Sequence, residues 1–177
     1  DTKVWMSLND YTGQYFFTFF NLVAETDTSE LWVQANLSWP AGDSRDTPVV
    51  TCEQAAYLLD EFDGNILPDE TSFFGSPDSN DGSMELLSQP WFWAPDPVPA
   101  FLADPNSYNP SNSDGRQVVL VSNIRDDSYY DSEYPNYIAG FYSPSFEAYF
   151  DRNIMSIDAY DWINRVGPDG SRPYLYE

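Results

Sequence analysis

The first fifty residues carry the hydrophobic pattern of β-strands. Aromatic and aliphatic side chains fill residues 3–8 and 14–20, and the turn-forming residues 9–13 lie between them. Two such runs around a short polar cluster predict a β-hairpin. Further along, Leu31, Val33 and Ala35 alternate with Trp32, Gln34 and Asn36. Because successive side chains of a strand point to opposite faces, this alternation predicts a strand with two different faces.

Residues 51–63 carry the clearest helical pattern. Thr51 and Gln54 have the spacing of a capping box, in which each side chain satisfies a free backbone amide of the first turn. Four apolar residues then follow at helical spacing on one face: Ala55, Leu58, Leu59 and Phe62. We expect Gly64 to end the helix. We expect Cys52, in the first turn, to be a packed thiol, since the chain has no histidine to serve as its base.

The remaining patterns complete an α+β fold, a strand-rich mixed sheet with one clear helix. Residues 117–122 are almost uniformly apolar and β-branched, which predicts a strand covered on both faces. Residues 137–142 and 153–158 are two further strand candidates, the second running into a helical turn over 159–164. We divide the chain into a β-rich segment, 1–50, and an α+β portion, 51–177, and expect one compact unit.

Charge and composition exclude several classes of function. The 177 residues include 29 acidic and 7 basic side chains, so the net charge is −22, and the chain contains no histidine. Such a surface repels phosphate, which argues against nucleic-acid binding and against docking on an anionic membrane. With no histidine and only Cys52, no Ser-His or Cys-His pair, imidazole metal site or intrachain disulfide can form. The chemistry of this chain must use carboxylates, hydroxyls and aromatic rings.

The middle of the chain concentrates both acid and proline. Residues 51–115 hold twelve acidic side chains and no basic one, and seven prolines lie between Pro77 and Pro110. We therefore expect a Pro-rich acidic excursion over 76–113. Trp91 and Trp93 in that stretch suggest a stacking platform for sugars, although pinning of the loop onto the core is the favoured interpretation.

Acidic side chains also gather after the predicted central strand. Four carboxylates fall within eight residues: Asp126, Asp127, Asp131 and Glu133. Calcium is coordinated by several oxygens from a flexible loop, so these four are our calcium candidates, against the alternative of a solvated acidic loop beside Arg125. Asp158 and Asp161 share a face if their segment is helical, but capping by Asp158 is the favoured role. Asn36 begins an Asn-Leu-Ser glycosylation triplet.

Ordered blocks in the second part of the chain resemble a known family. They are residues 123–131, 137–142 and 151–162, with the helix 55–63 and residues 65–68 upstream. They resemble secreted bacterial zinc metallopeptidases of the zincin type, the hyicolysin-like and immune-inhibitor-A-like proteins. The resemblance covers roughly residues 50–177 and consists of several blocks, with no single diagnostic motif.

The resemblance implies a scaffold role for this chain. In that family a His-Glu-x-x-His helix binds zinc, and it is expected shortly after a segment similar to residues 172–177. This chain has no histidine, so no residue is assigned as catalytic, and zinc is expected only in a downstream segment absent from it. A strand before that helix edges the cleft and pairs with substrate, which makes the following residues the substrate-edge candidates: Tyr137, Ile138, Ala139, Gly140, Phe141 and Tyr142. An ordinary interior strand is the alternative.

Three functions follow as hypotheses. The first is the N-terminal scaffold portion of a secreted zinc metallopeptidase, not catalytic by itself, whose partner is a downstream catalytic segment. The second is a non-catalytic extracellular module, such as a filament or surface-assembly subunit, which binds another copy of itself through an open strand edge. The third is a carbohydrate-binding β-rich module. The chain begins at Asp1 as a processed secreted protein would, so we expect a secreted or extracellular location.

Overall fold

The fold is built around one six-stranded sheet with the strand order β1-β2-β3-β4-β6-β5. A computed structural model describes residues 1–87, 115–160 and 162. Its strands are β1 (Thr2–Asn9), β2 (Gln14–Glu25), β3 (Ser29–Gln34), β4 (Gln117–Ser122), β5 (Gly140–Tyr142) and β6 (Ile154–Asp158). Its helices are α1 (Cys52–Glu61), a π-helical turn (Phe62–Ile66), α2 (Leu67–Phe74), α3 (Asp127–Tyr130) and α4 (Pro144–Phe150). The predicted α+β class, dominated by strands, is confirmed.

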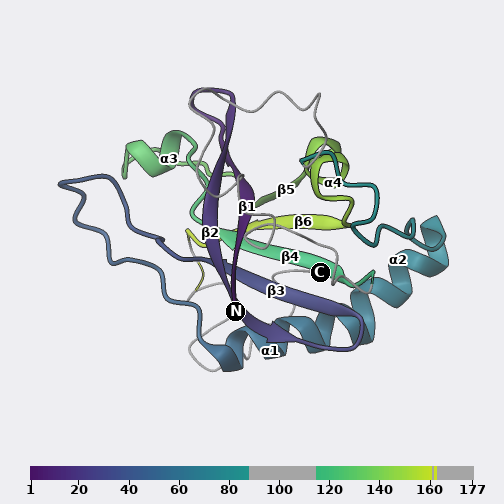
Figure 1. The fold of residues 1–177 in the computed structure, drawn as a ribbon. Coiled ribbons are helices and arrows are strands. Elements are labelled where there is room, and N and C mark those ends of the chain that lie inside the picture. The colour runs from purple at the N-terminus through teal and green to yellow at the C-terminus, as the bar shows by residue number, and fades with distance from the viewer. Residues whose placement is uncertain (88–114, 161, 163–177) are drawn as a thin grey trace.

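The predicted hairpin forms at the N-terminus and bends the sheet. β1 and β2 pair antiparallel from Thr2↔Asn21 to Asn9↔Gln14, and the Asn9 side chain accepts a hydrogen bond from the Thr12 amide. The register of β2 against β3 shifts between Leu22 and Ala24. Such irregularities increase the local twist, and the hairpin runs steeply across the remaining strands (Figure 1).

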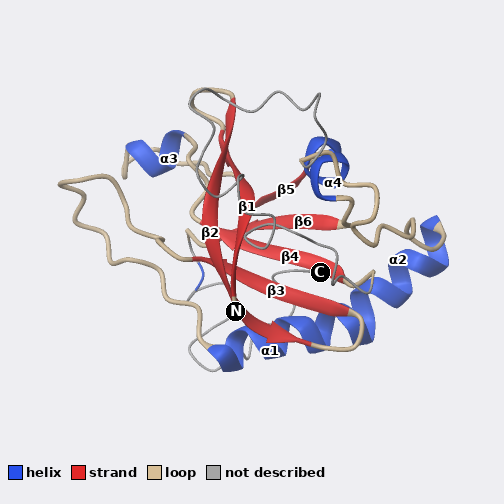
Figure 2. Cartoon of the chain, in the orientation of Figure 1, coloured by secondary structure: helices blue, strands red, loops and turns tan. Residues whose placement is uncertain are grey.

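The centre of the sheet is parallel and covered on both faces. β3 pairs with β4, and β4 with β6, in parallel register. Side chains of β4 alternate between two clusters: Val118 and Leu120 pack with Trp5, Trp32 and Phe150, while Val119 and Val121 pack with residues of α1. Complete burial of each large apolar side chain contributes about 1.5–3 kcal/mol. The strand predicted to be covered on both faces is therefore confirmed, with α1 on one face and α4 with the hairpin on the other (Figure 2).

The long helix begins as predicted but does not end at Gly64. Thr51 caps α1, and Thr51 and Gln54 form the full capping box. The helix continues through the π-helical turn into α2 and ends at Gly75, whose φ is 96°. Pro68 lacks an N–H and would clash with the carbonyl of residue 64 in a regular α-helix. The wider turn, in which the Leu67 amide donates to the Phe62 carbonyl, accommodates this proline.

A second expectation for this helix is also wrong. Cys52 is exposed, not packed, because the first turn of α1 faces solvent at that position. The apolar stripe predicted for the helix is buried: Ala55, Leu58, Leu59 and Phe62.

A buried ion pair joins the amino-terminal ends of the parallel strands. Arg152, just before β6, donates from Nη2 to the Glu30 carboxylate of β3 and to the Arg116 carbonyl before β4. The Arg152 and Glu30 side chains are 1% and 4% exposed. The interaction fixes the three parallel strands at one end.

The helices of the described ranges are short or amphipathic. None of them is both long and apolar enough to cross a membrane.

Candidate functional site

The carboxyl ends of the three parallel strands meet at one edge of the sheet. The segments that follow β3, β4 and β6 begin at residues 35, 123 and 159. In open sheets of parallel strands, ligands bind outside this edge, in the crevice between the connecting segments. The acidic residues singled out in the sequence follow β4 and β6, so they lie at this edge.

Asp126 has a structural role there. It is buried and caps α3: its Oδ1 accepts hydrogen bonds from the Ser128 hydroxyl at 2.8 Å and the Tyr129 amide at 3.0 Å. Its Oδ2 accepts from the Ile138 amide at 2.7 Å. Both oxygens therefore hold the segment between β4 and β5 in shape.

The other calcium candidates do not join Asp126 in one cluster. Asp127 lies exposed in the first turn of α3, and Asp131 accepts a hydrogen bond from the Glu133 amide at 3.0 Å, with both residues exposed. Throughout residues 1–87 and 115–160, no three His, Cys, Asp or Glu side chains come together in a way that could hold a metal ion. Calcium binding at this segment stays a prediction.

Asp158 closes the end of β6. Its Oδ1 accepts hydrogen bonds from the Ile124 amide at 3.3 Å and the Tyr160 amide at 3.0 Å, and the residue is buried. The carboxylate thus ties the segments after β4 and β6 together, and capping of a helix by Asp158 stays a prediction. Asp161, its proposed partner, lies outside the described residues, as does most of the helical turn predicted over 159–164.

An arginine missed by the sequence reasoning also holds this edge. The Arg45 guanidinium lies 3.7 Å from the centre of the Trp39 ring and donates to the Ser128 carbonyl at 2.8 Å and the Tyr129 carbonyl at 3.0 Å. It also pairs with Asp43 at 2.6 Å, and these hydrogen bonds hold the pKa of the Asp43 carboxyl below its ordinary value. Arg45 therefore links the segment after β3 to the segment after β4.

The predicted substrate-edge strand is shorter than expected. Of residues 137–142, Gly140–Tyr142 form β5, which pairs antiparallel with β6. The preceding residues are held differently: the Ile138 amide donates to Asp126, and the Tyr137 ring lies 4.6 Å from the Tyr160 ring. Contact with β6 begins at the Ala139 carbonyl, which accepts from the Asp158 amide at 2.9 Å, so only the second half of the segment runs along the sheet.

β5 lies at the end of the sheet, with no strand on its other side in the described part of the chain. Gly140 and Tyr142 are exposed. A Cβ atom at Gly140 would lie 2.6 Å from the Ser156 carbonyl oxygen of β6. Glycine therefore permits the close approach of the two backbones that places β5 at this edge.

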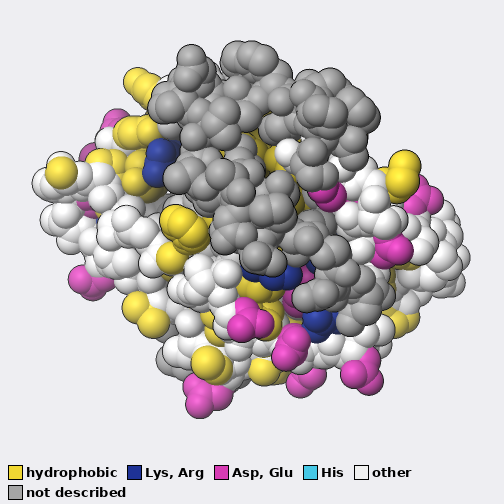
Figure 3. Space-filling view, viewed as in Figure 1, with side chains coloured by type: hydrophobic (Ala, Val, Ile, Leu, Met, Phe, Trp, Pro, Cys, Tyr) yellow, Lys and Arg dark blue, Asp and Glu magenta, His cyan; other side chains and the backbone are white. Residues whose placement is uncertain are grey.

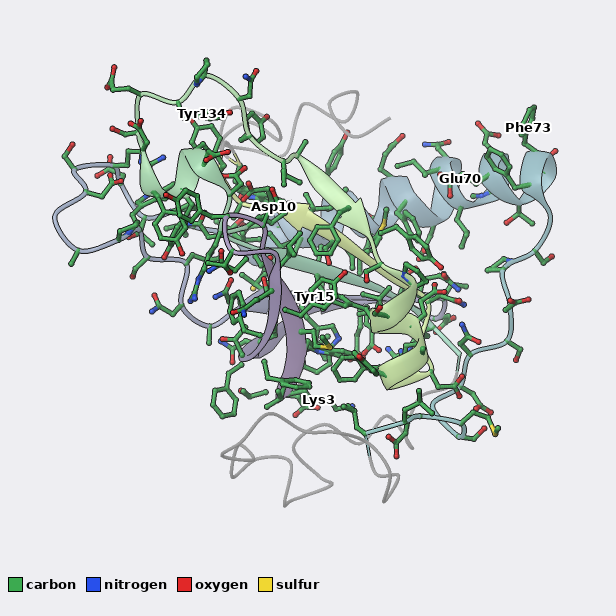
Figure 4. The ribbon with its side chains drawn as sticks, turned by 90° about the horizontal axis from the view of Figure 1, so that it is seen from above. Lys3, Asp10, Tyr15, Glu70, Phe73 and Tyr134 are labelled. Atoms are coloured by element: carbon green, nitrogen blue, oxygen red, sulfur yellow. The ribbon has the colours of Figure 1, made fainter. Side chains whose placement is uncertain are left out.

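A groove opens beside the carboxyl end of β5. It has a volume of about 510 Å³ and lies between α2, α4 and the amino-terminal ends of β4 and β6. We call it the α2 groove, and its lining includes apolar residues Phe62, Leu67, Phe74, Pro77, Ile154 and Met155 and acidic residues Glu70, Asp78 and Glu147. Figure 4 shows Glu70 and Phe73 on α2, which extends away from the sheet.

Tyr142 connects the α2 groove to β5. It is the last residue of β5, it lines the groove, and its hydroxyl donates to Glu147 Oε2 at 2.6 Å. This hydrogen bond to the carboxylate raises the pKa of the Tyr142 phenol, because ionising the phenol would break it. Phe73 and Phe74 beside the groove are 83% and 80% exposed. Sequence reasoning missed this groove because its lining comes from segments far apart along the chain.

Two other sequence candidates have simple outcomes. Asn36 and Ser38 of the glycosylation triplet are exposed, and Asn36 Oδ1 accepts a hydrogen bond from the Ser38 amide at 3.0 Å, whereas Leu37 between them is buried. Trp91 and Trp93 lie outside the described residues, together with most of the Pro-rich excursion.

Comparison with known proteins adds no relative to this geometry. No protein-family model matches the chain, and no curated protein matches it either. The resemblance to zincin-type metallopeptidases therefore stays a prediction from the sequence blocks.

Proposed function

We propose that this chain is the N-terminal scaffold portion of a secreted zinc metallopeptidase of the zincin type, not catalytic by itself. In this proposal β5 pairs with the backbone of an extended peptide substrate, and a downstream segment supplies the zinc site. The chain then forms one wall of the substrate cleft.

The observation that carries the proposal is the position of β5. It closes one side of the sheet, it runs antiparallel to its neighbour β6, and its exposed residues Gly140 and Tyr142 flank Phe141. An extended peptide that adds to such an edge gains main-chain hydrogen bonds, with pockets for alternate side chains giving specificity. The blocks that resemble the family include this strand, which the resemblance independently nominates as the substrate edge.

The described residues do not fit zinc themselves. The sequence has no histidine, and no suitable group of three ligands comes together in the described ranges. We therefore assign no metal ligand and no catalytic step to this chain. The buried carboxylates Asp126 and Asp158 instead hold the segments that follow β4 and β6 in place.

The encoding gene provides the first test. We expect a His-Glu-x-x-His motif within the next few dozen codons after Glu177, and zinc-dependent peptidase activity in the secreted product. Absence of the motif from that stretch of the reading frame contradicts the proposal.

Peptide binding provides the second test. We expect an extended peptide to bind the purified chain, and N-methylation of alternate peptide amides to abolish binding, because methylation removes the N–H groups that pair with a strand edge. Equal binding of methylated and unmethylated peptides contradicts a role of β5 in strand pairing.

The proposal includes calcium as an ion that stabilises the acidic segment after β4. Its candidate ligands are Asp126 and the exposed carboxylates of Asp127, Asp131 and Glu133. An ion that binds the folded state and not the unfolded state raises the midpoint of thermal unfolding, Tm. We therefore expect a higher Tm in millimolar calcium than in chelator, and an unchanged Tm contradicts this part of the proposal.

A further inference from the structure

We propose that the α2 groove is a specificity subsite for a basic side chain, lysine or arginine, of the polypeptide that pairs with β5. The inference rests on the proposed function in that β5 brings the peptide to the groove. It adds a substrate class: extended segments that carry a basic residue beside apolar ones.

The first argument is the direction of β5. Its last residue, Tyr142, pairs with Met155 of β6, and both residues line the groove. Side chains of paired residues in adjacent strands lie on the same face of a sheet, and alternate residues of an added strand return to that face. A peptide added to the free edge of β5 thus presents every second side chain on the face of Tyr142 and Met155, two of the residues that line the groove.

The second argument is the apolar floor. Phe62, Leu67 and Met155 contribute apolar surface to a volume of about 510 Å³. That volume exceeds what a bare ion needs, and no set of three acidic, cysteine or histidine ligands gathers in the described ranges to hold one. Lysine and arginine combine a long aliphatic stem with a charged end, so they can cover apolar surface and still reach an acidic rim.

The third argument is the charge of the rim. Glu70, Asp78 and Glu147 all line the groove, and no lysine or arginine of the described ranges does. In the described part of the chain none of the three forms an ion pair. Hydrogen bonds from Asn153 to the Asp78 carbonyl and from Tyr142 to Glu147 fix two sides of this rim. The groove therefore favours a cation and disfavours an acidic or phosphorylated ligand.

The same charges argue against a second copy of this chain as the occupant. The chain carries −22 overall and only seven basic residues. Three of these, Arg45, Arg116 and Arg152, are already engaged in ion pairs within the fold. Two copies would repel each other before either could supply a basic side chain, so a basic segment of another polypeptide is the occupant.

Binding of two short fluorescent peptides to the purified chain tests the inference. The peptides are extended heptapeptides that differ at one position, arginine in one and norleucine in the other, so that only the charged end changes. We expect the arginine peptide to bind roughly five- to tenfold more tightly at low salt, and this preference to shrink as NaCl is raised. Equal affinities, or no binding of either peptide, overturn the inference.

Charge-neutralising variants locate the effect. In Glu70→Gln/Asp78→Asn we expect the arginine preference to fall to about twofold or less, while norleucine binding is unchanged. The matched control is Glu53→Gln/Asp60→Asn, which removes two exposed carboxylates from α1, outside the groove, with the same change in net charge. An arginine preference that falls equally in both variants overturns the inference, since it would reflect net charge alone.

Methylated peptides separate this inference from the proposed function. If the unmethylated arginine peptide binds better than the norleucine peptide and N-methylation abolishes binding of both, pairing with β5 and the subsite stand together. If the methylated arginine peptide still binds better than the methylated norleucine peptide, the subsite stands and pairing with β5 is contradicted. If the unmethylated peptides bind with equal affinity and only methylation weakens them, pairing stands and the subsite is overturned.

Discussion

Gly140 is the residue on which the edge position of β5 depends most directly. A methyl group there would meet the Ser156 carbonyl oxygen at 2.6 Å, which is backbone and cannot rotate away. We predict that Gly140→Ala lowers the free energy of unfolding by about 1–3 kcal/mol, because the two strands must move apart. Urea denaturation measures this loss.

Gly64 offers the matched control for that substitution. It lies in the π-helical turn, its φ is not positive, and a Cβ there meets nothing within 4 Å. Because alanine favours helix over glycine by up to about 1 kcal/mol, Gly64→Ala should leave stability unchanged or raise it. Equal losses in the two variants would contradict the steric explanation.

The buried pair of Arg152 and Glu30 should be costly to break from either side. Glu30→Gln leaves a buried guanidinium without its carboxylate, and we predict a loss of about 3–5 kcal/mol in the free energy of unfolding. Removing both charges in Glu30→Gln/Arg152→Met should cost less than the sum of the single changes. Chemical denaturation of the two single variants and the double variant measures this coupling.

Glu25 provides a comparison for the buried pair. It binds Arg116 at 2.8 Å, but its side chain is 57% exposed. Exposed ion pairs contribute at most about 1 kcal/mol, so Glu25→Gln should have a small effect. A loss as large as that of Glu30→Gln would show that burial does not explain the difference.

Asp43 allows a pH prediction at the carboxyl edge of the sheet. Hydrogen bonds from the Arg45 side chain and amide lower its pKa from the ordinary value of 3.8. A carboxyl whose pKa is lower in the folded state stabilises the fold above its unfolded pKa, and this contribution is lost as pH falls through the folded value. We predict that Arg45→Gln raises the Asp43 pKa in an NMR titration, whereas an unchanged titration would contradict the assigned cause.

At the scale of elements, the start of the long helix combines a local signal with a distant contact. Thr51 Oγ1 accepts from the Gln54 amide, and Gln54 Oε1 accepts from the Thr51 amide and from the Trp162 indole. We predict that Thr51→Ala costs about 1 kcal/mol of stability, and that Thr51→Ser, which keeps the hydroxyl, costs much less. Thermal unfolding followed by circular dichroism compares the two, and equal losses would rule out the cap as the cause.

The elements that sequence predicts best are those fixed by neighbours along the chain. The capping box of α1, the hairpin of β1 and β2, and the apolar run of β4 depend on spacings of a few residues. Gly64 does not mark the end of the helix, although its residue type predicts one. The helix continues because a π-helical turn accommodates Pro68, four residues further on. The length of β5 is overestimated from sequence because Ile138 bonds to the side chain of Asp126, twelve residues away.

The candidate site is less predictable because its contacts are long-range. The α2 groove combines α2 with residues near 117, 142, 147 and 154, and Arg152 finds Glu30 across 122 positions. The hydrophobic pattern of a single segment cannot predict contacts between residues that lie so far apart in the sequence. The sequence does single out the carboxylates that follow β4 and β6. In the structure two of them, Asp126 and Asp158, accept the hydrogen bonds that stabilise this edge of the sheet.

At the scale of the whole molecule, the net negative charge affects association of this chain with other chains. Acidic side chains are scattered over the face in Figure 3, where basic ones are few. The strong net negative charge keeps a protein soluble and opposes contact between copies. An open strand edge works in the opposite direction, because its unpaired backbone groups can template addition of another strand.

The balance between these two effects predicts the state of the purified chain. In the described part of the chain the sheet ends in β1 on one side and in the three-residue β5 on the other, and two copies of charge −22 repel each other. We predict a monomer in sedimentation velocity at micromolar concentration. Salt screens repulsion beyond about 8 Å at physiological ionic strength, and more strongly at about 0.5 M NaCl, so a monomer that persists there would show that neither β1 nor β5 pairs two copies of the chain. Dimers or filaments whose population rises with salt would instead favour the structural-module hypothesis. They would show that copies of the chain associate once salt screens the repulsion between their charges.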